Sequence, residues 1–386
     1  MSSAATAPLR CDIAVVGGGL VGLAFVRLLN DMLDQNESRL RIAIIEARPP
    51  AADQSGADEL RVSAVAPAVQ AILRRIGTWE KLQEDAYCPY TDMRVWQEDG
   101  AAFGARSIHF DAAELGVPEL GHIVNNRAMR AAAWSGLDAL PGVDLLLHEK
   151  PAELIATGRG WRMTFESGTK LQTRLLVAAD GTNSWARQAL AIRVRHVPHG
   201  QRAIVARLVS EQPHQQTAWQ RFLRTGPVAL LPLRDGSSSL VWSCTDSLAD
   251  ELMSLPSRDF SARLTCATDR VLGDLECVSD RLSFPLASGN AVTYTGARYA
   301  LLGDAAHQVH PLAGQGLNLG LFDAAVLAEL LGQHLRHPSA DPGDRRVLRG
   351  YERSRKGDNV VTQQLMIALN SLFSGELASA GGVGLG

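Results

Sequence analysis

Residues 12–22 read DIAVVGGGLVG, an apolar and β-branched run that ends in closely spaced glycines. Gly17, Gly19 and Gly22 form the pattern G-x-G-x-x-G, and the helical spacing of residues 20–33 continues directly from it. A strand that turns through glycines into a helix lets backbone amides approach a pyrophosphate at the helix N-terminus. We therefore expect a dinucleotide site at the start of an α/β unit.

A second buried strand is expected at residues 40–46 (LRIAIIE), parallel to the first if the connection is a right-handed crossover. Its last residue, Glu46, can accept hydrogen bonds from an adenosine ribose, and its charge would repel a 2′-phosphate. The predicted dinucleotide is therefore FAD or NAD rather than NADP. In the alternative reading the glycines serve only close packing of the helix on the strand.

The pattern changes in the middle of the chain, where strand-like runs at residues 203–210, 228–233 and 239–244 predict an antiparallel sheet with a hairpin turn at 234–237. Helical spacing is predicted outside this region, over residues 64–76, 126–140, 317–334 and 347–373, and further strands at 170–179 and 299–303. We predict an α/β fold in which a Rossmann-like FAD-binding domain is interrupted by a mostly antiparallel substrate-domain sheet. The expected boundaries are 1–80, 100–195 and 292–375 for the FAD-binding domain, 81–99 and 196–291 for the sheet, and 376–386 for a flexible tail.

Composition excludes several classes of protein. With 38 basic and 41 acidic side chains the net charge is −3, which argues against a nucleic-acid partner. The five cysteines form no C-x-x-C pair, so neither a zinc site nor a disulfide framework is expected, and we predict a reducing, cytoplasmic compartment. No run approaches the roughly 20 apolar residues that a membrane-spanning helix needs.

Two further motifs stand where apolar strands end. ADGTNSWAR at residues 179–187 carries Asp180, and GDAAH at residues 303–307 carries Asp304, whose carboxylate could hold the ribitol hydroxyls of a flavin. The glycine-rich stretch PLAGQGLN at residues 311–318 would let the backbone approach a flat ring. An NAD domain needs none of these motifs, so FAD is favoured, although each alone could be an ordinary turn or helix cap.

The combined motifs resemble those of the single-component FAD-dependent aromatic hydroxylases, and among them the ubiquinone-biosynthesis hydroxylases that act on polyprenylated phenols. The resemblance covers residues 12 to about 375 and is carried by the segments GGGLVG, LRVSAV, LGHIVNN, ADGTNSWAR, GDAAHQVHPLAGQGLNLG and YERSRK, together with Glu46. It implies an enzyme that takes electrons from NAD(P)H as a transient reductant. A flavin hydroperoxide formed from O2 would then hydroxylate the substrate ring, at carbon 5 in preference to carbon 6.

The resemblance also implies roles for individual residues. Those expected to bind FAD are Gly17, Gly19 and Gly22 at the pyrophosphate, Glu46 at the adenosine ribose, Arg61 near the phosphates and ribitol, Asn126, Asp180 and Gly181, Asp304 at the ribitol, and Pro311, Gly314, Gln315, Gly316 and Asn318 beside the isoalloxazine. Asp180 is also expected to serve the transient pyridine nucleotide.

The middle sheet is expected to present an apolar wall over the flavin that excludes water. The candidate substrate contacts are Phe222, Leu230, Pro232, Trp242 and Phe284, each with plain core packing as the alternative. His307 is a candidate for deprotonating the phenol, with a structural hydrogen-bonding role as its alternative, and Pro311 is a second catalytic candidate.

A long prenyl substrate implies contact with the inner face of the cytoplasmic membrane. Arg349, Arg353, Arg355 and Lys356 could meet anionic headgroups there, although they could equally form a solvated helix face. The resemblance further implies association with other ubiquinone-biosynthesis proteins. Three rival functions share the motifs: a hydroxylase of a small aromatic acid, which an arginine facing the flavin from the sheet would indicate, an FAD reductase of polyprenyl groups, and a non-catalytic flavoprotein scaffold.

Overall fold

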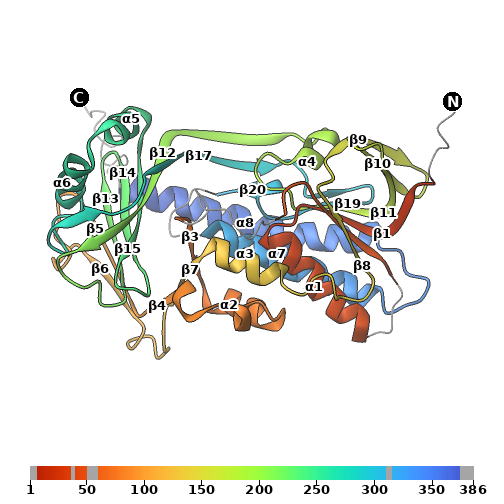
Figure 1. The fold of residues 1–386 in the computed structure, drawn as a ribbon, viewed down its shortest axis with the longest axis horizontal. Coiled ribbons are helices and arrows are strands. Elements are labelled where there is room, and N and C mark those ends of the chain that lie inside the picture. The colour runs from red at the N-terminus through yellow and green to blue at the C-terminus, as the bar shows by residue number, and fades with distance from the viewer. Residues whose placement is uncertain (1–6, 36–39, 50–59, 310–314, 374–386) are drawn as a thin grey trace, which may run out of the picture.

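The computed structural model describes residues 7–35, 40–49, 60–309 and 315–373, and places them in three sheets covered by helices (Figure 1). The predicted tail at 376–386 lies outside the described residues. The mixed α/β fold, with one mainly parallel and one mainly antiparallel sheet, agrees with the predicted fold class.

The eight-stranded sheet holds the glycine turn. β1 (Leu9–Val16) lies between β2 (Ile42–Glu46) and β11 (Lys170–Ala178), parallel to both, and Val15 pairs with Ile44 on one side and Val177 on the other. The sheet continues through β8 (Val143–Leu147), β19 (Tyr299–Leu301) and β18 (Thr295–Gly296), while β10 (Gly160–Phe165) and β9 (Pro151–Thr157) extend it from β11. The predicted strand at 40–46 and its parallel pairing are confirmed.

Helices cover this sheet. α1 (Leu20–Gln35) packs against α7 (Gln315–His334), and α7 packs against α8 (Arg345–Phe373). The apolar stripe of α1, which includes Leu23, Phe25 and Leu29, is fully buried against the parallel strands. All three helices were predicted, because each combines helical spacing with an apolar face that this sheet can bury.

A three-stranded sheet made of β3 (Val62–Val65), β7 (Gly121–Asn125) and β4 (Tyr87–Tyr90) was not predicted. The helix predicted over 64–76 is shorter, α2 (Pro67–Arg75), because Val62–Val65 pairs with β7. The helix predicted over 126–140 ends at Trp134 as α3 (Asn126–Trp134), and Gly136 then adopts a φ of 72°. α4 (Trp185–Ala189) begins within the motif at 179–187.

The nine-stranded sheet contains the strands of the middle region, β12 (Val194–Ser210), β13 (Thr217–Leu223), β14 (Gly226–Pro232), β15 (Ser238–Thr245), β16 (Leu275–Cys277) and β17 (Leu282–Ala291). It also takes in β5 (Asp92–Gln97), β6 (Ile108–Asp111) and β20 (His307–Gln308). β14 and β15 form the predicted hairpin, and only β5 with β13 pairs in parallel among these strands. Two unpredicted helices, α5 (Asp246–Ser254) and α6 (Ser257–Ala267), pack against one face of this sheet.

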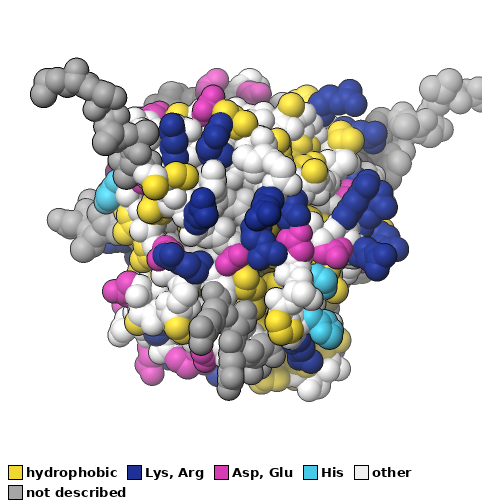
Figure 2. All heavy atoms as spheres, turned by 90° about the vertical axis from the view of Figure 1, so that its right-hand side faces the viewer, with side chains coloured by type: hydrophobic (Ala, Val, Ile, Leu, Met, Phe, Trp, Pro, Cys, Tyr) yellow, Lys and Arg dark blue, Asp and Glu magenta, His cyan; other side chains and the backbone are white. Residues whose placement is uncertain are grey.

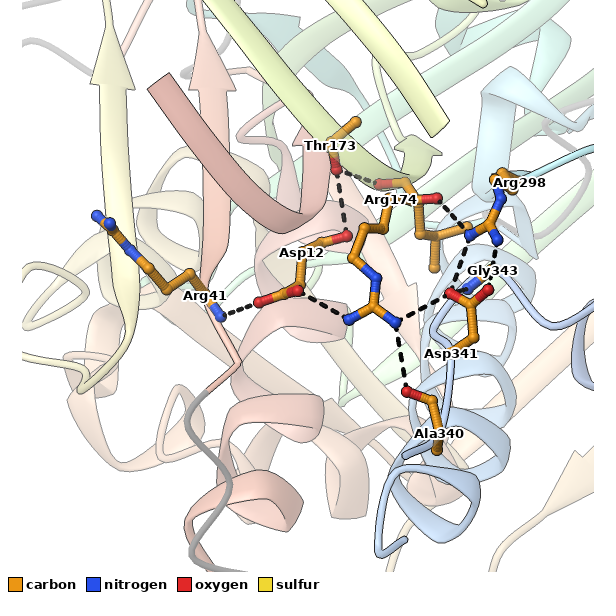
Figure 3. A network of polar contacts seen from close by, with 9 residues as sticks. Asp12, Arg41, Thr173, Arg174, Arg298, Ala340, Asp341 and Gly343 are labelled. Carbon is orange, nitrogen blue, oxygen red and sulfur yellow. Dashed lines mark hydrogen bonds and ion pairs between the residues drawn. The ribbon is translucent and has the colours of Figure 1, made fainter. Parts of the chain in front are cut away.

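A network of hydrogen bonds and ion pairs links the connection between α7 and α8 to the first half of β1 in the parallel sheet (Figure 3). Asp341 in this connection accepts hydrogen bonds from both terminal nitrogens of Arg298, from Nη2 of Arg174 at 3.3 Å and from the Gly343 amide at 3.1 Å. Arg174 in turn donates from Nη1 to Oδ1 of Asp12 in β1, at 3.0 Å. The hydrogen bond with Arg298 lowers the pKa of the Asp341 carboxyl. The network therefore holds three distant chain segments at the end of β1 opposite the glycine turn.

The surface at this end of the molecule carries Lys and Arg side chains interspersed with acidic and apolar ones (Figure 2). The basic cluster near the start of α8 is only partly available to a membrane, which corrects the prediction. Arg355 is 6% exposed and binds Asp323, and Lys356 pairs with Glu352 and donates to a backbone carbonyl. None of the described helices combines the length and the apolar character that crossing a bilayer requires.

Candidate functional site

The glycine turn between β1 and α1 combines tight packing with open space. A Cβ on Gly17, where φ is 107°, would lie 2.4 Å from the carbonyl oxygen of Ala179, and one on Gly22 would lie 2.2 Å from the Gly17 carbonyl oxygen. A Cβ on Gly19 would meet nothing within 4 Å. Gly17 and Gly22 are therefore needed for packing, while Gly19 borders a cavity into which the α1 amides can receive a phosphate.

Glu46 lies at the carboxyl end of β2, beside this turn. Its Oε2 accepts a hydrogen bond from the Gly18 amide at 2.7 Å, and its Oε1 accepts one from the Arg48 amide at 2.8 Å. Trp134 of α3 donates from Nε1 to the Gly18 carbonyl at 3.0 Å, so the turn is held from two directions. Each carboxylate oxygen has a second lone pair, which leaves acceptor capacity for a ribose hydroxyl.

Asp180, directly after β11, organises the start of α4. Its Oδ1 accepts from the Ser184 hydroxyl at 2.5 Å and its Oδ2 from the Ala186 amide at 3.0 Å. Burial raises the pKa of Asp180, and these hydrogen bonds oppose that rise. The adjacent Gly181, with a φ of 77°, lines the cavity.

Arg187, the last residue of the 179–187 motif, connects two loops that meet at the cavity. It is 8% exposed and donates from Nη2 to the Thr182 carbonyl at 2.7 Å and from Nη1 to the Ala305 carbonyl at 3.0 Å. Thr182 donates from its hydroxyl to Oδ2 of Asp304 at 3.3 Å. The sequence motif contained Arg187, but its bridging role depends on the tertiary approach of residues 182 and 305 and was not predicted.

A cavity of about 680 Å³ lies where these loops face the nine-stranded sheet. It brings together six of the predicted FAD residues, Gly19, Arg61, Asn126, Gly181, Asp304 and Gly316. The Oδ1 atom of Asn126 is buried and has no hydrogen-bond partner in the described part of the chain. Open space above Gly19, an orphaned acceptor at Asn126 and the exposed carboxylate of Asp304 fit the phosphates and hydroxyls of FAD.

Asn318 and Gln315, two further predicted FAD residues, are not among the residues that line the cavity. Asn318 is 2% exposed and binds the backbone of the segment before α2, donating to the Ala64 carbonyl at 2.9 Å and accepting from the Ala66 amide at 3.3 Å. Gln315 begins α7, and Pro311 and Gly314 lie outside the described residues. Arg127 and Arg130 also line the cavity and were missed, although they lie one and four residues beyond the LGHIVNN segment.

The opposite wall is one face of the nine-stranded sheet. Because successive side chains of a strand point to opposite faces, alternate residues such as Ala229 and Leu231 of β14 line the cavity. Phe284 of β17 lines it too, with the Arg61 guanidinium carbon 5.3 Å from the centre of its ring. Phe222 is buried with Val95 in a small cluster beside the wall.

Three of the five predicted substrate contacts are on the other face of this sheet. Leu230 and Trp242 belong to the core under α5 and α6, and the ring of Trp242 lies 6.3 Å from that of Phe260. Pro232 alternates with the cavity-lining Leu231 and is buried. The proposed contacts at Leu230, Pro232 and Trp242 are therefore corrected to core packing.

His307 is 2% exposed, and its Nε2 lies 2.5 Å from Oδ2 of Asp323 in α7. Asp323 is fully buried and also accepts from the Gly303 amide at 3.1 Å and from Nε of Arg355 at 2.8 Å. Burial alone would raise the pKa of Asp323, but the neighbouring His307 and Arg355 lower it. This placement favours the structural reading of His307, which holds the loop that carries Asp304.

Comparison with known proteins gives a consistent result. A family model described as an FAD binding domain matches residues 10–364. The chain is 37% identical to the ubiquinone hydroxylase UbiL of Rhodospirillum rubrum, over 95% of this chain and 82% of that protein. It is 32% identical to the 3-demethoxyubiquinol 3-hydroxylase of Escherichia coli K12, over 95% of this chain and 90% of that protein. Its fold resembles that of PqsL from Pseudomonas aeruginosa, with a TM-score of 0.78 at 22% identity over 96% and 99% of the two chains.

Proposed function

The chain belongs to the family of FAD-dependent hydroxylases of ubiquinone biosynthesis, and from this we propose that it hydroxylates the aromatic ring of a polyprenylated phenol. We propose ring carbon 5 as the position, with carbon 6 as the next choice. FAD, when bound, supplies the oxidation chemistry with NAD(P)H as the transient reductant and O2 as the source of the new oxygen.

The observation that carries the proposal is the contrast between the two walls of the 680 Å³ cavity. One wall holds the carboxylate of Asp304, the amide of Asn126 and the open backbone at Gly19, which suit the polar parts of FAD. The other is a largely apolar sheet face, which suits an electron-rich, apolar ring and excludes water from it. A neutral phenol with a hydrocarbon chain matches the second wall.

The sheet wall also bears on the rival substrate, a small aromatic acid. Such a substrate needs a cation near its carboxylate, and an arginine is the usual partner. The arginines that line the cavity in the described part of the chain are Arg61, Arg127 and Arg130, and none of them comes from the nine-stranded sheet. The ring-facing wall is therefore uncharged, which favours the phenol over the acid.

The chain's own residues would act by binding and positioning. Gly19 and Asp304 would hold the phosphates and ribitol, and Glu46 the adenosine ribose. Arg187, which binds the carbonyl groups of both cavity loops, keeps Asp304 facing the cavity. Phe284 would place the ring between the flavin and the sheet. Contact with a membrane surface and with other ubiquinone-biosynthesis proteins is part of the proposal, because a polyprenyl chain partitions into lipid.

The test is hydroxylation by the FAD-loaded protein. A short-chain 2-prenylphenol should stimulate both NAD(P)H oxidation and O2 consumption and yield a product one oxygen heavier, whose ring position is read by NMR. 4-Hydroxybenzoate serves as the matched small acid. Stimulation and hydroxylation by the acid alone would overturn the proposal, and NAD(P)H oxidation without O2 consumption would favour the reductase of polyprenyl groups.

A deletion strain separates the enzyme from a non-catalytic scaffold. Cells that lack the gene should accumulate a polyprenylphenol one oxygen short of the next intermediate, and the intact gene should restore ubiquinone. The Asp304→Ala form should not restore it. Full restoration by Asp304→Ala protein that has lost its FAD would support the scaffold function instead.

A further inference from the structure

The cavity wall contributed by the nine-stranded sheet contains a few polar side chains among its apolar ones. Alternate residues of β14 and β15 line the cavity together with residues 218–220 of β13, and most of them are apolar, such as Ala218, Ala229 and Val241. Gln220 of β13 and two serines of β15, Ser239 and Ser243, lie on the same wall. An apolar wall with a few polar groups is the usual construction of a site that orients a small molecule.

These polar side chains are buried and lack protein partners. Gln220 is 7% exposed, and Ser239 and Ser243 are each 3% exposed. The Ser239 hydroxyl has no hydrogen-bond partner, and the side chains of Gln220 and Ser243 bind no group in the described part of the chain. A buried hydroxyl without a partner costs about 1–3 kcal/mol, and a bound molecule with a polar group would satisfy the Ser239 hydroxyl.

The strand register places the three polar residues around one point of the wall. Ala229 pairs with Gln220 on one side and with Val241 on the other, so Gln220 and Val241 lie in one row. Ser239 and Ser243 flank Val241 along β15, each about 7 Å away. Ser243 also shares a row with Phe284, because both pair with Ala203. Of the three polar residues, Ser243 is therefore the nearest to Phe284, and Gln220 is the farthest, because β13 lies four strands from β17.

We propose that Gln220, with Ser239 and Ser243, selects the substrate by hydrogen bonding the oxygen substituents of its ring. The inference rests on the proposed function and deepens it, since it assigns residues to the recognition of a phenol. The Gln220 amide can donate to a phenolic oxygen and accept from its hydroxyl, whereas the serines can bind further ring oxygens. The pattern of these groups would determine which ring face and which carbon meet the flavin.

The experiment pairs protein variants with ligand variants. The FAD-loaded wild type and the Gln220→Leu variant are titrated with 2-prenylphenol and with prenylbenzene, which lacks the hydroxyl, and binding is followed by the absorbance of the bound flavin. Gln220→Leu should weaken binding of the phenol about tenfold and leave that of prenylbenzene unchanged. Equal weakening of both ligands, or of neither, would overturn the assignment of Gln220.

A matched pair of serines controls for general effects on the sheet. Ser238 and Ser239 are neighbours in β15, and both have buried hydroxyls that find no hydrogen-bond partner among the described residues. Ser239 lines the cavity, and Ser238 points to the opposite face. For a ligand with a second ring oxygen, such as a prenylated catechol, Ser239→Ala should weaken binding while Ser238→Ala does not. Equal effects of the two substitutions would overturn the role of Ser239.

Two further readouts keep the outcomes distinct. Because the Gln220 side chain forms no hydrogen bond with the described part of the chain, and leucine suits a largely apolar wall, the Gln220→Leu variant should melt at the same temperature as the wild type or higher when no substrate is present. A lower melting temperature with weaker binding of both ligands would show that Gln220 acts in folding. If the wild type binds none of the phenols, the proposed function fails, and the assignment of Gln220 to phenol recognition fails with it.

Discussion

Replacement of Asp323 by alanine should be among the most destabilising single changes in the molecule. The Asp323 carboxylate is fully buried between α7 and α8, and it accepts from the Gly303 amide, Nε2 of His307, Nε of Arg355 and Nδ2 of Asn359 at 3.1, 2.5, 2.8 and 3.2 Å. The Arg355 guanidinium, itself 6% exposed, would lose its strongest partner. Removal of one member of such a buried pair costs about 3–5 kcal/mol.

An exposed ion pair of similar geometry gives the comparison. Nη2 of Arg41 lies 2.7 Å from Oδ2 of Asp144, but the two side chains are 59% and 43% exposed. A pair in water contributes about 0–1 kcal/mol, so Arg41→Ala should cost several times less than Asp323→Ala. The difference reflects the burial of the Asp323 carboxylate and the four hydrogen bonds that it accepts, because the Arg41 pair is exposed and has one contact.

The assay is urea unfolding at saturating FAD, followed by circular dichroism, for the wild type and both variants. A double variant, Asp323→Leu with Arg355→Met, should recover part of the lost free energy of unfolding, because no uncompensated charge then stays buried. Equal losses from Asp323→Ala and Arg41→Ala would refute the reasoning, since they would show that water reaches the Asp323 site.

Three further outcomes are expected. Gly22→Ala should prevent folding, because the new Cβ would lie 2.2 Å from a carbonyl oxygen, whereas Gly19→Ala should fold and bind FAD more weakly, as shown by circular dichroism and FAD titration. With native protein at pH 8, a thiol reagent should modify the exposed Cys266 rapidly and leave the buried Cys11 unmodified, because burial raises the pKa of the Cys11 thiol to about 12. The carboxyl of Asp323 has a lowered pKa in the folded chain, so its contribution is complete above the unfolded pKa of about 4 and is lost as pH falls through the folded value. The stability difference between the wild type and Asp323→Ala should therefore narrow in acid unfolding experiments below pH 4, and a constant difference would contradict this.

The parts of the fold that depend on local sequence were predictable. The strand, glycine turn and helix at residues 12–33 follow from a contiguous sequence pattern, in which the spacing of the glycines predicts the turn. Gly22 sits against the Gly17 carbonyl, five residues away, and Glu46 ends the next strand at the place predicted from its position. Motifs of this kind identify the cofactor because the chain segment that binds it is short and continuous.

The substrate wall could not be predicted in the same way. Val241 and Trp242 are adjacent and both apolar, yet one lines the cavity and the other packs under α6. Because side chains alternate along a strand, Val241 and Trp242 point to opposite faces of the sheet. Which face meets the cavity depends on the pairing of β15 with β12 and β14 and on the helices that cover the other face. Trp242 was predicted from its position in the middle sheet, and position along a strand does not say which of the two faces meets the cavity.

The same dependence on long-range pairing explains how the site is assembled. The predicted helix began at residue 64, but Val62–Val65 forms a strand, because it pairs with β7 more than fifty residues later in the chain. That strand follows Arg61 directly, so the pairing brings Arg61 to the cavity opposite Phe284. Two distant residues likewise position the loop that carries Asp304. Arg187 donates to the Ala305 carbonyl of this loop, and Asp323 accepts from the Gly303 amide and from His307 on either side of Asp304. The groups that would bind FAD are therefore short local motifs, whereas their positions relative to the substrate wall depend on contacts between segments far apart in the chain.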